Sequence, residues 1–160
     1  MNYEFELVTD NDILEQNNRI IRNWIINFNA PFVGGDADRY SIYLKDSETK
    51  IIGGACVYAH VSSIYIDVLW VSDSHRAKGL GAKLLQKVEV EAIRRGNNAS
   101  TLDTFSFQAE RFYCKQGYHN IGTVHDYLEG HDRIFMRKKL LEWCLIVMKK
   151  SAIKRITISE

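Results

Sequence analysis

A glycine-containing basic loop near the middle of the chain is the first place where residue types and spacing suggest chemistry. Arg76, Lys78, Gly79 and Gly81 form the pattern R-x-x-G-x-G. Glycine allows an anion to approach the backbone without a Cβ in the way, and the two basic side chains add positive charge. The loop therefore predicts a site for a phosphate or a similar anion.

The segments on either side of this loop suit that reading. Residues 64–71 (IYIDVLWV) form a short apolar run typical of a buried strand, with Asp67 as its one charge. After the loop, apolar residues recur at helical spacing from Leu84 to Ala92, and Gly96 ends the pattern. The first backbone N–H groups of such a helix have no partner within the helix, so the strand, loop and helix together favour an anion site.

Known phosphate-loop patterns discriminate between several families. The dinucleotide pattern G-x-G-x-x-G fails because Leu84 stands at the third glycine position, and the pattern G-x-x-x-x-G-K-[ST] is absent. R-x-x-G-x-G between an apolar strand and a helix resembles the pyrophosphate loop of the GNAT superfamily, which comprises acyl-CoA-dependent N-acyltransferases. The plain alternative is an ordinary strand-to-helix turn with solvated basic side chains.

A second stretch, residues 106–118 (SFQAERFYCKQGY), strengthens the resemblance. It is similar to the GNAT signature N-x-x-A-x-x-[LF]-Y-x-x-x-G-[FY], with matches at Ala109, Phe112, Tyr113, Gly117 and Tyr118. Ser106 departs from it by standing where asparagine is usual, and a hydroxyl offers fewer donors than an amide. The resemblance covers roughly residues 3–140, and its finer placement is the bacterial small-molecule branch.

The resemblance implies a reaction and a set of binding residues. An amine would attack the thioester of acetyl-CoA directly, and placing both reactants side by side would remove much of the barrier. Pantetheine would bind the backbone of Leu69, Trp70 and Val71, with a further contact at Ser106. Tyr113 matches the tyrosine that protonates the departing thiolate; alternatively it is a core aromatic. The pyrophosphate would lie on the loop and helix start, which comprise Arg76, Ala77, Lys78, Gly79, Leu80, Gly81 and Ala82.

The general base is Asp67 in this reading. Strand alternation puts Asp67 on the same face as Tyr65, Leu69 and Val71, and burial there would raise its pKa and suit it to proton transfer through water. Alternatively Asp67 orients the substrate or is structural. Asp103 and His75 are further candidates.

Other reactive residues carry weaker signals. His119, His125 and His131 share strand parity, but no recognised zinc spacing accompanies them, and the resemblance implies no metal. Cys114 follows Tyr113, but no histidine–asparagine pair can be assigned to it, and direct transfer needs no covalent enzyme intermediate.

The remaining pattern predicts an α/β (α+β) fold. We expect strands at about residues 3–9, 40–45, 51–61, 99–105, 118–127 and 131–140 besides 64–71, a helix from Ile13 to Phe28 capped by Thr9 or Asp10, a loop over residues 29–38, and a short helix at 108–116. The crossover through the central helix makes strands 64–71 and 99–105 parallel. The resemblance adds that this pair splays, within a mixed, mostly antiparallel sheet of about 6–7 strands with helices on both faces.

Composition sets the outer limits. The 160 residues predict one domain. The resemblance implies that residues 1–140 are an acetyltransferase domain and that residues 141–160 are a C-terminal extension. A formal net charge of +1 gives no support to a nucleic-acid role, and no apolar run reaches the ~18 residues of a membrane span. Three widely spaced cysteines and no signal-peptide pattern favour the cytoplasm. The apolar run 141–148 favours packing on the domain or in a homodimer.

The acceptor is the least determined part. Acidic residues in plausible acceptor loops favour a small cationic amine; they are Asp36, Asp38, Asp126, Glu129 and Asp132. Two alternatives stay open, namely acetylation of a protein N-terminus or lysine, and a GNAT-fold module that binds acyl-CoA without catalysis.

Overall fold

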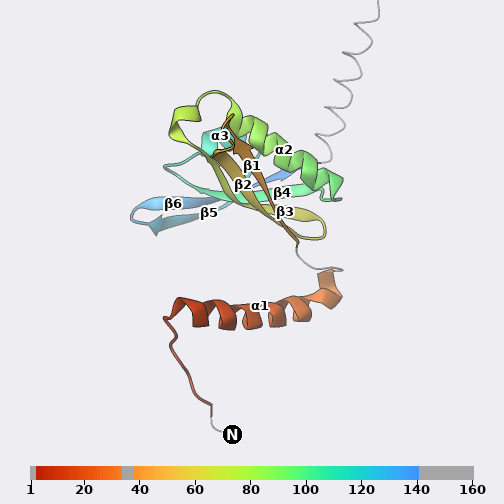
Figure 1. Ribbon diagram of the computed structural model, residues 1–160, viewed down its shortest axis with the longest axis vertical. Coiled ribbons are helices and arrows are strands. Elements are labelled where there is room, and N and C mark those ends of the chain that lie inside the picture. The colour runs from red at the N-terminus through yellow and green to blue at the C-terminus, as the bar shows by residue number, and fades with distance from the viewer. Residues whose placement is uncertain (1–2, 34–37, 141–160) are drawn as a thin grey trace, which may run out of the picture. The chain divides into compact units, whose positions relative to one another are not determined.

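The computed structural model describes residues 3–33 and 38–140. The chain divides into two compact units, residues 1–36 and 37–160, and each is described by itself (Figure 1).

The N-terminal unit consists of an extended segment and one helix. Helix α1 spans Asn11–Val33, and Asp10 caps its N-terminal end. Oδ1 of Asp10 accepts hydrogen bonds from the backbone N–H groups of Asp12 and Ile13, both at 3.1 Å. This confirms the predicted cap and satisfies two N–H groups that the helix itself leaves unpaired.

Two sequence expectations for this unit are wrong. Residues 3–10 form no strand; the other described element of this unit is a helix, and a strand needs a neighbouring strand to pair with. The predicted loop from residue 29 begins too early, since α1 continues to Val33 with Pro31 inside its last turn. A proline lacks the N–H that would bond to the carbonyl four residues earlier, and its ring crowds that carbonyl, so the earlier turns form and the helix ends two residues after Pro31.

The second unit is built on a six-stranded sheet in the order β1-β2-β3-β4-β6-β5. The strands are β1 (Asp38–Lys45), β2 (Ile51–Ala59), β3 (Ser63–Val71), β4 (Ala99–Phe105), β5 (His119–Leu128) and β6 (His131–Lys139). All neighbours are antiparallel except β3 and β4, which are parallel. The predicted mixed sheet with one parallel pair is therefore confirmed.

Helices α2 (Leu80–Arg94) and α3 (Glu110–Lys115) lie on the same face of this sheet (Figure 1). The buried face of α2 consists of Leu84, Leu85, Val88 and Ala92, which recur at helical spacing as the sequence predicts. They pack in one core with residues of the central strands, among them Ile64, Ile66, Leu102, Ile134 and Met136. Full burial of each large aliphatic side chain contributes roughly 1.5–3 kcal/mol, so this face fixes α2, and with it the preceding loop, against β3.

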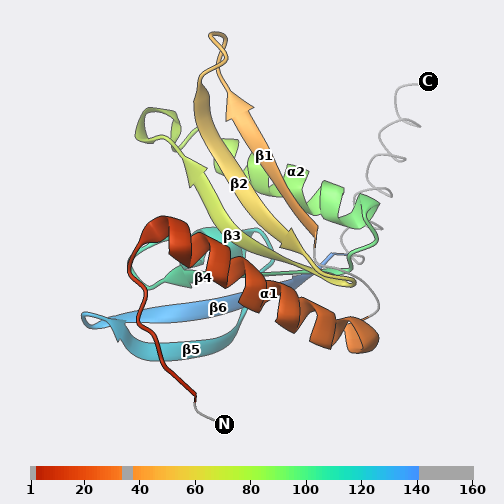
Figure 2. The ribbon, with the colours of Figure 1, turned by 60° about the horizontal axis from the view of Figure 1, so that its bottom comes forward.

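The parallel pairing of β3 and β4 is short. Four residue pairs join the strands, from Ser63 with Ala99 to Ile66 with Leu102. Beyond these pairs the strands diverge. Figure 2 shows β1, β2 and β3 lying at an angle to β5 and β6. We call the diverging segments, residues 67–71 of β3 and 103–105 of β4, the splay.

The expectations for the C-terminal extension, residues 141–160, lie outside the described residues. The described chain ends at Leu140, which is buried and whose N–H donates to the carbonyl of Asn98 at 2.8 Å.

Candidate active site

The loop between β3 and α2 has the conformation expected of an anion site. Gly79, the residue before α2, has φ +74°, and a Cβ there would meet no atom within 4 Å. Ala77 also has positive φ, at 59°. These left-handed residues turn the chain sharply, so that α2 begins at Leu80 with its first N–H groups directed back toward the loop. The sequence-predicted residues 76–82 therefore all lie at the N-terminal end of α2.

The two basic side chains of the loop partly stabilise the loop itself. Arg76 donates from Nε to the carbonyl of Val71 at 3.0 Å and pairs with the Asp73 carboxylate at 2.8 Å. Lys78 donates from Nζ to the carbonyl of Ser74 at 2.9 Å. Both cations thus lie close to the loop, where they contribute positive potential beside the helix N-terminus.

Asp67 lies at the first position of the splay, in a β-bulge. Val57 pairs with Ile66 and Cys56 pairs with Val68, so Asp67 has no partner in the β2–β3 register. The extra residue inverts the alternation along β3, which the sequence analysis assumed to be regular. Leu69 and Val71 consequently pack against the core, opposite to Tyr65, and the expected shared face is wrong.

The expected burial of Asp67 is also wrong for this unit. Its side chain is exposed, because it follows the buried Ile66 and lies outside the row of β3 residues that faces the core. The carboxylate is accessible at the start of the splay, so it can contact water or a bound molecule there.

Tyr113 lies in α3 and is buried, with 8% of its surface exposed. Its ring packs edge-on against Phe112 and Tyr118. Burial, together with the negative charge of Asp103, raises the pKa of Tyr113 to about 12. The phenol therefore keeps its proton at neutral pH, so its hydroxyl can donate a hydrogen bond.

The structure reveals a charged network at the splay that the sequence analysis missed. Arg133 donates from Nε to Asp103 Oδ2 at 2.6 Å and from Nη2 to Asp103 Oδ1 at 3.0 Å, and the hydroxyl of Tyr65 donates to the same carboxylate. Burial alone would raise the pKa of Asp103, but these hydrogen bonds outweigh it and hold the pKa below its usual value.

This network bears on the choice of base. Asp103 was a candidate, but its carboxylate is ionised and engaged by two donors, which suits an orienting role better than proton transfer. The alternation of side chains along the parallel strands β3 and β4 could have predicted from the sequence that Tyr65 lies near Asp103. The partnership with Arg133 depends on the register between β4 and β6, in which Phe105 pairs with Arg133, and the sequence does not fix that register.

Ser106 connects the end of β4 to β6. Its N–H donates to the carbonyl of Asp132 at 2.9 Å, and its hydroxyl oxygen accepts from the N–H of Asp132 at 3.2 Å. The hydroxyl proton can still be donated elsewhere, so a cofactor contact at Ser106 is compatible with this geometry. His75, another candidate, is bracketed by the hydroxyls of Ser72 and Ser74 at 2.8 and 2.9 Å from Nδ1.

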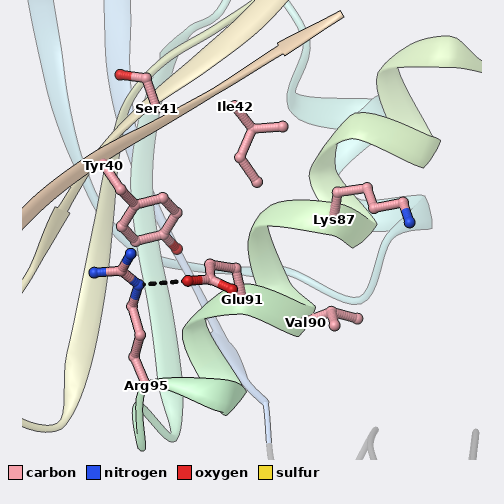
Figure 3. A pocket seen from close by; sticks show the side chains of 7 residues that line it. All are labelled: Tyr40, Ser41, Ile42, Lys87, Val90, Glu91 and Arg95. Carbon is pink, nitrogen blue, oxygen red and sulfur yellow. Dashed lines mark hydrogen bonds and ion pairs between the residues drawn. The ribbon is translucent and has the colours of Figure 1, made fainter.

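A surface pocket lies away from these residues, between β1 and α2 (Figure 3). Its residues bind one another: Arg95 pairs with Glu91 at 2.7 Å and lies over the ring of Tyr40, whose hydroxyl donates to the carbonyl of Val88. These contacts hold the edge strand β1 on α2, and none of the predicted site residues lines the pocket.

Over residues 3–33 and 38–140, no group of three His, Cys, Asp or Glu side chains is arranged to hold a metal ion. In the same part of the chain, no helix combines the length and apolarity of a membrane span.

Comparison with known proteins agrees with this geometry. Residues 8–118 match the family described as "Acetyltransferase (GNAT) family". An acetyltransferase of Agrobacterium fabrum is 26% identical over 122 residues, which are 76% of this chain and 89% of that protein. Blasticidin-S acetyltransferase of Streptomyces morookaense is 29% identical over 102 residues, or 63% and 75% of the two chains.

A solved structure gives the same answer for the fold. The crystal structure of an acetyltransferase from Bacillus cereus superposes with a TM-score of 0.74 at 34% sequence identity, covering 86% of this chain and 98% of that one. The segment that matches the family, residues 8–118, contains both the loop at residues 76–82 and the stretch around Tyr113. The chain belongs to the GNAT family of acetyltransferases.

Proposed function

We propose that the protein transfers the acetyl group of acetyl-CoA to a primary amine of a small, cationic molecule by direct attack in a ternary complex. One observation carries the proposal: β3 and β4 separate after Ile66 and Leu102, with an anion-binding loop at the end of β3 and a buried, protonated tyrosine after β4. An extended thioester cofactor fits between such strands, since its charged end and its reactive end need different surroundings.

The cofactor would be held largely by backbone groups. Its pyrophosphate binds the N–H groups at residues 79–82, with Arg76 and Lys78 adding positive charge. Its pantetheine arm follows residues 69–71 of β3, which lie beyond the last β3–β4 pair, with Ser106 opposite. The side chains of residues 69–71 matter little for this contact, because any strand offers backbone groups for hydrogen bonds.

The reaction then needs three groups in order. The neutral amine attacks the thioester carbonyl, the C–S bond breaks, and the thiolate of CoA takes the proton of Tyr113. Tyr113 recovers a proton from solvent. The proton released by the amine passes through water to Asp67, whose exposed position at the bulge supports this role.

The acceptor class rests on two supports. A relative with 29% identity carries the name blasticidin-S acetyltransferase, which names a small molecule as its acceptor. In addition, Glu129 in the β5–β6 turn, Asp126 in β5 and Asp132 in β6 carry negative charge that attracts a cation.

We also propose a homodimer, because the apolar run at residues 141–148 needs a surface to cover it. Solution mass before and after deletion of residues 141–160 tests this. A full-length chain that is monomeric at high concentration contradicts the dimer.

The function is tested by screening amines for CoA release from acetyl-CoA, with polyamines, aminoglycosides, amino-nucleosides and short peptides as separate groups. We expect release with a small cationic amine. Release with peptides alone would replace the small-molecule acceptor by a protein terminus or lysine. Binding of acetyl-CoA without release by any amine would favour a binding module.

A further inference from the structure

Aromatic side chains gather where β4 ends and the β5–β6 hairpin turns. The rings of Phe105 and Phe107 are stacked, with centroids 5.4 Å apart and planes 8° from parallel. Tyr127 lies 6.0 Å from Phe105, and His131 meets Phe107 edge-on at 4.7 Å. We call these four residues the ring cluster.

The ring cluster leaves much apolar surface uncovered. Within its unit, Phe107 is 55% exposed and Tyr127 is 50% exposed. Each of these rings would gain free energy from being covered, and aromatic faces are covered best by another flat ring in offset or edge-on contact.

The ring of Tyr127 is held in place. The guanidinium of Arg133 lies 5.0 Å from the centroid of the Tyr127 ring and donates from Nη1 to its hydroxyl at 3.0 Å. Arg133 is itself fixed by both oxygens of Asp103. A ring surface ordered in this way loses little freedom when a ligand binds, which favours selective recognition.

The ring cluster adjoins the splay. Phe105 is the last residue of β4, two positions after Asp103, and Phe107 lies in the connection from β4 to α3, which carries Tyr113. Asp103 is close enough to contribute to the raised pKa of Tyr113. A molecule on these rings is therefore next to the place where the thioester would react.

We propose that the acceptor is a primary amine attached to a flat, unsaturated ring, and that this ring stacks on Phe107 and Tyr127 while the amine reaches the splay. The proposal rests on the proposed function and names the acceptor class more closely. Phe107 and Tyr127 would then determine specificity without touching the reacting atoms.

The test compares matched amines. Acetylation of 2-phenylethylamine and of 2-cyclohexylethylamine is measured by CoA release, since the two differ in ring flatness and carry the same aminoethyl chain. We expect kcat/KM to favour the aromatic amine by roughly 3- to 10-fold, the size of one aromatic pair contact. Phe107→Leu, which keeps an apolar side chain, should bring the ratio close to one.

Tyr43→Leu is the matched control, because Tyr43 is 56% exposed and lies on the edge strand β1. It should leave the ratio unchanged. Equal use of both amines by the wild-type chain, or an unchanged ratio in Phe107→Leu, would overturn the proposal. So would a Phe107→Leu variant that loses folding stability at an unchanged ratio, since the ring would then serve contacts within the chain.

A binding measurement separates this proposal from the proposed function. Calorimetric titration of 2-phenylethylamine into the chain saturated with CoA reports stacking whether or not turnover occurs. Binding weakened by Phe107→Leu without acetylation of any amine would contradict the transferase mechanism and retain the ring site. Acetylation of other amines without any binding of 2-phenylethylamine would do the reverse.

Discussion

At the scale of single residues, the account depends on a proton that stays on Tyr113. Burial raises the pKa of this phenol to about 12, so the neutral form persists across the pH range in which enzymes work. A raised pKa means that the proton is lost only as the pH rises toward that value. The alkaline side of the rate profile should therefore show no loss from deprotonation of Tyr113 below about pH 10.

Replacement of Tyr113 by phenylalanine removes the hydroxyl and keeps the ring that packs against Phe112 and Tyr118. We expect kcat to fall by roughly 10- to 1000-fold, with little change in acetyl-CoA affinity, because the proton acts only as the thiolate departs. Steady-state rates and calorimetric binding check both parts. Unchanged turnover would make Tyr113 a core residue.

Arg133 offers a test of the charged network through folding stability. Because the folded-state pKa of Asp103 is lowered, its contribution is present above the unfolded pKa and is lost as pH falls through the lower folded value. Arg133→Gln should cost about 1–2 kcal/mol at pH 7, at the low end for a charged hydrogen bond because Arg133 is partly exposed.

Urea unfolding at pH 7 and at an acidic pH measures this difference, which should shrink as the pH falls through the lowered pKa of Asp103 and its carboxylate takes up a proton. The control is Arg94→Gln, since Arg94 pairs with Glu91 on the solvent side of α2 and its loss should change stability little. An equal cost of Arg133→Gln at both pH values would show that its packing, not its charge, matters.

At the scale of elements, much of the site was predictable. The strand, loop and helix over residues 64–95 follow from the change of hydrophobic period around two glycines. The parallel partner 99–105 follows from the length of the crossover. The bulge at Asp67 was not predictable, since an inserted residue leaves a strand pattern apolar and only alters which side each side chain faces. The β4–β6 register that brings Arg133 to Asp103 was not predictable either, because no local pattern records how two strands far apart in the sequence align.

The N-terminal end of α2 is tested by a pair of glycines with similar backbones. Gly79 and Gly96 have φ of +74° and +88°, and a Cβ at either would meet nothing within 4 Å. Replacement of either by aspartate strains the backbone by a comparable amount, but only Gly79→Asp puts a negative charge at the predicted anion site. Acetyl-CoA should therefore raise the unfolding temperature of wild type and Gly96→Asp, and leave Gly79→Asp unchanged.

A loss of that stabilisation in both glycine variants would trace the effect to weakened folding rather than to the anion site. Full stabilisation in both would show that the cofactor phosphates bind elsewhere.

A buried ion pair fastens α2 to β6. Lys138 donates to both oxygens of Glu89, at 2.7 and 2.8 Å, and both side chains are buried. Lys138→Met should destabilise the fold by about 3–5 kcal/mol, because it leaves the buried carboxylate of Glu89 without its ion-pair partner. The double variant Glu89→Leu with Lys138→Met should recover most of that loss in denaturant unfolding. A double variant as unstable as the single one would show that the packing of Lys138, rather than its charge, holds α2.

At the scale of the whole molecule, the second unit contains the sheet, the loop predicted to bind an anion, Tyr113 and the ring cluster. The sequence predicted a helix in the first unit correctly and a strand at residues 3–9 incorrectly. A helix can satisfy its backbone within one segment, whereas a strand needs a neighbour whose identity no local pattern records. The ring cluster, which we propose as the acceptor site, combines residues from β4, its following loop and both hairpin strands, so no single stretch of sequence indicates it.

The central claim is direct transfer from acetyl-CoA to an amine. The most direct measurement incubates the chain with acetyl-CoA, with and without an acceptor amine from the screen, and follows free CoA, N-acetylated amine and the intact mass of the protein. The account predicts amine-dependent CoA release, one N-acetylated product for each CoA, and an unmodified protein throughout. CoA release without an acetylated amine, or an acetyl group retained on the protein as an intermediate, would contradict it.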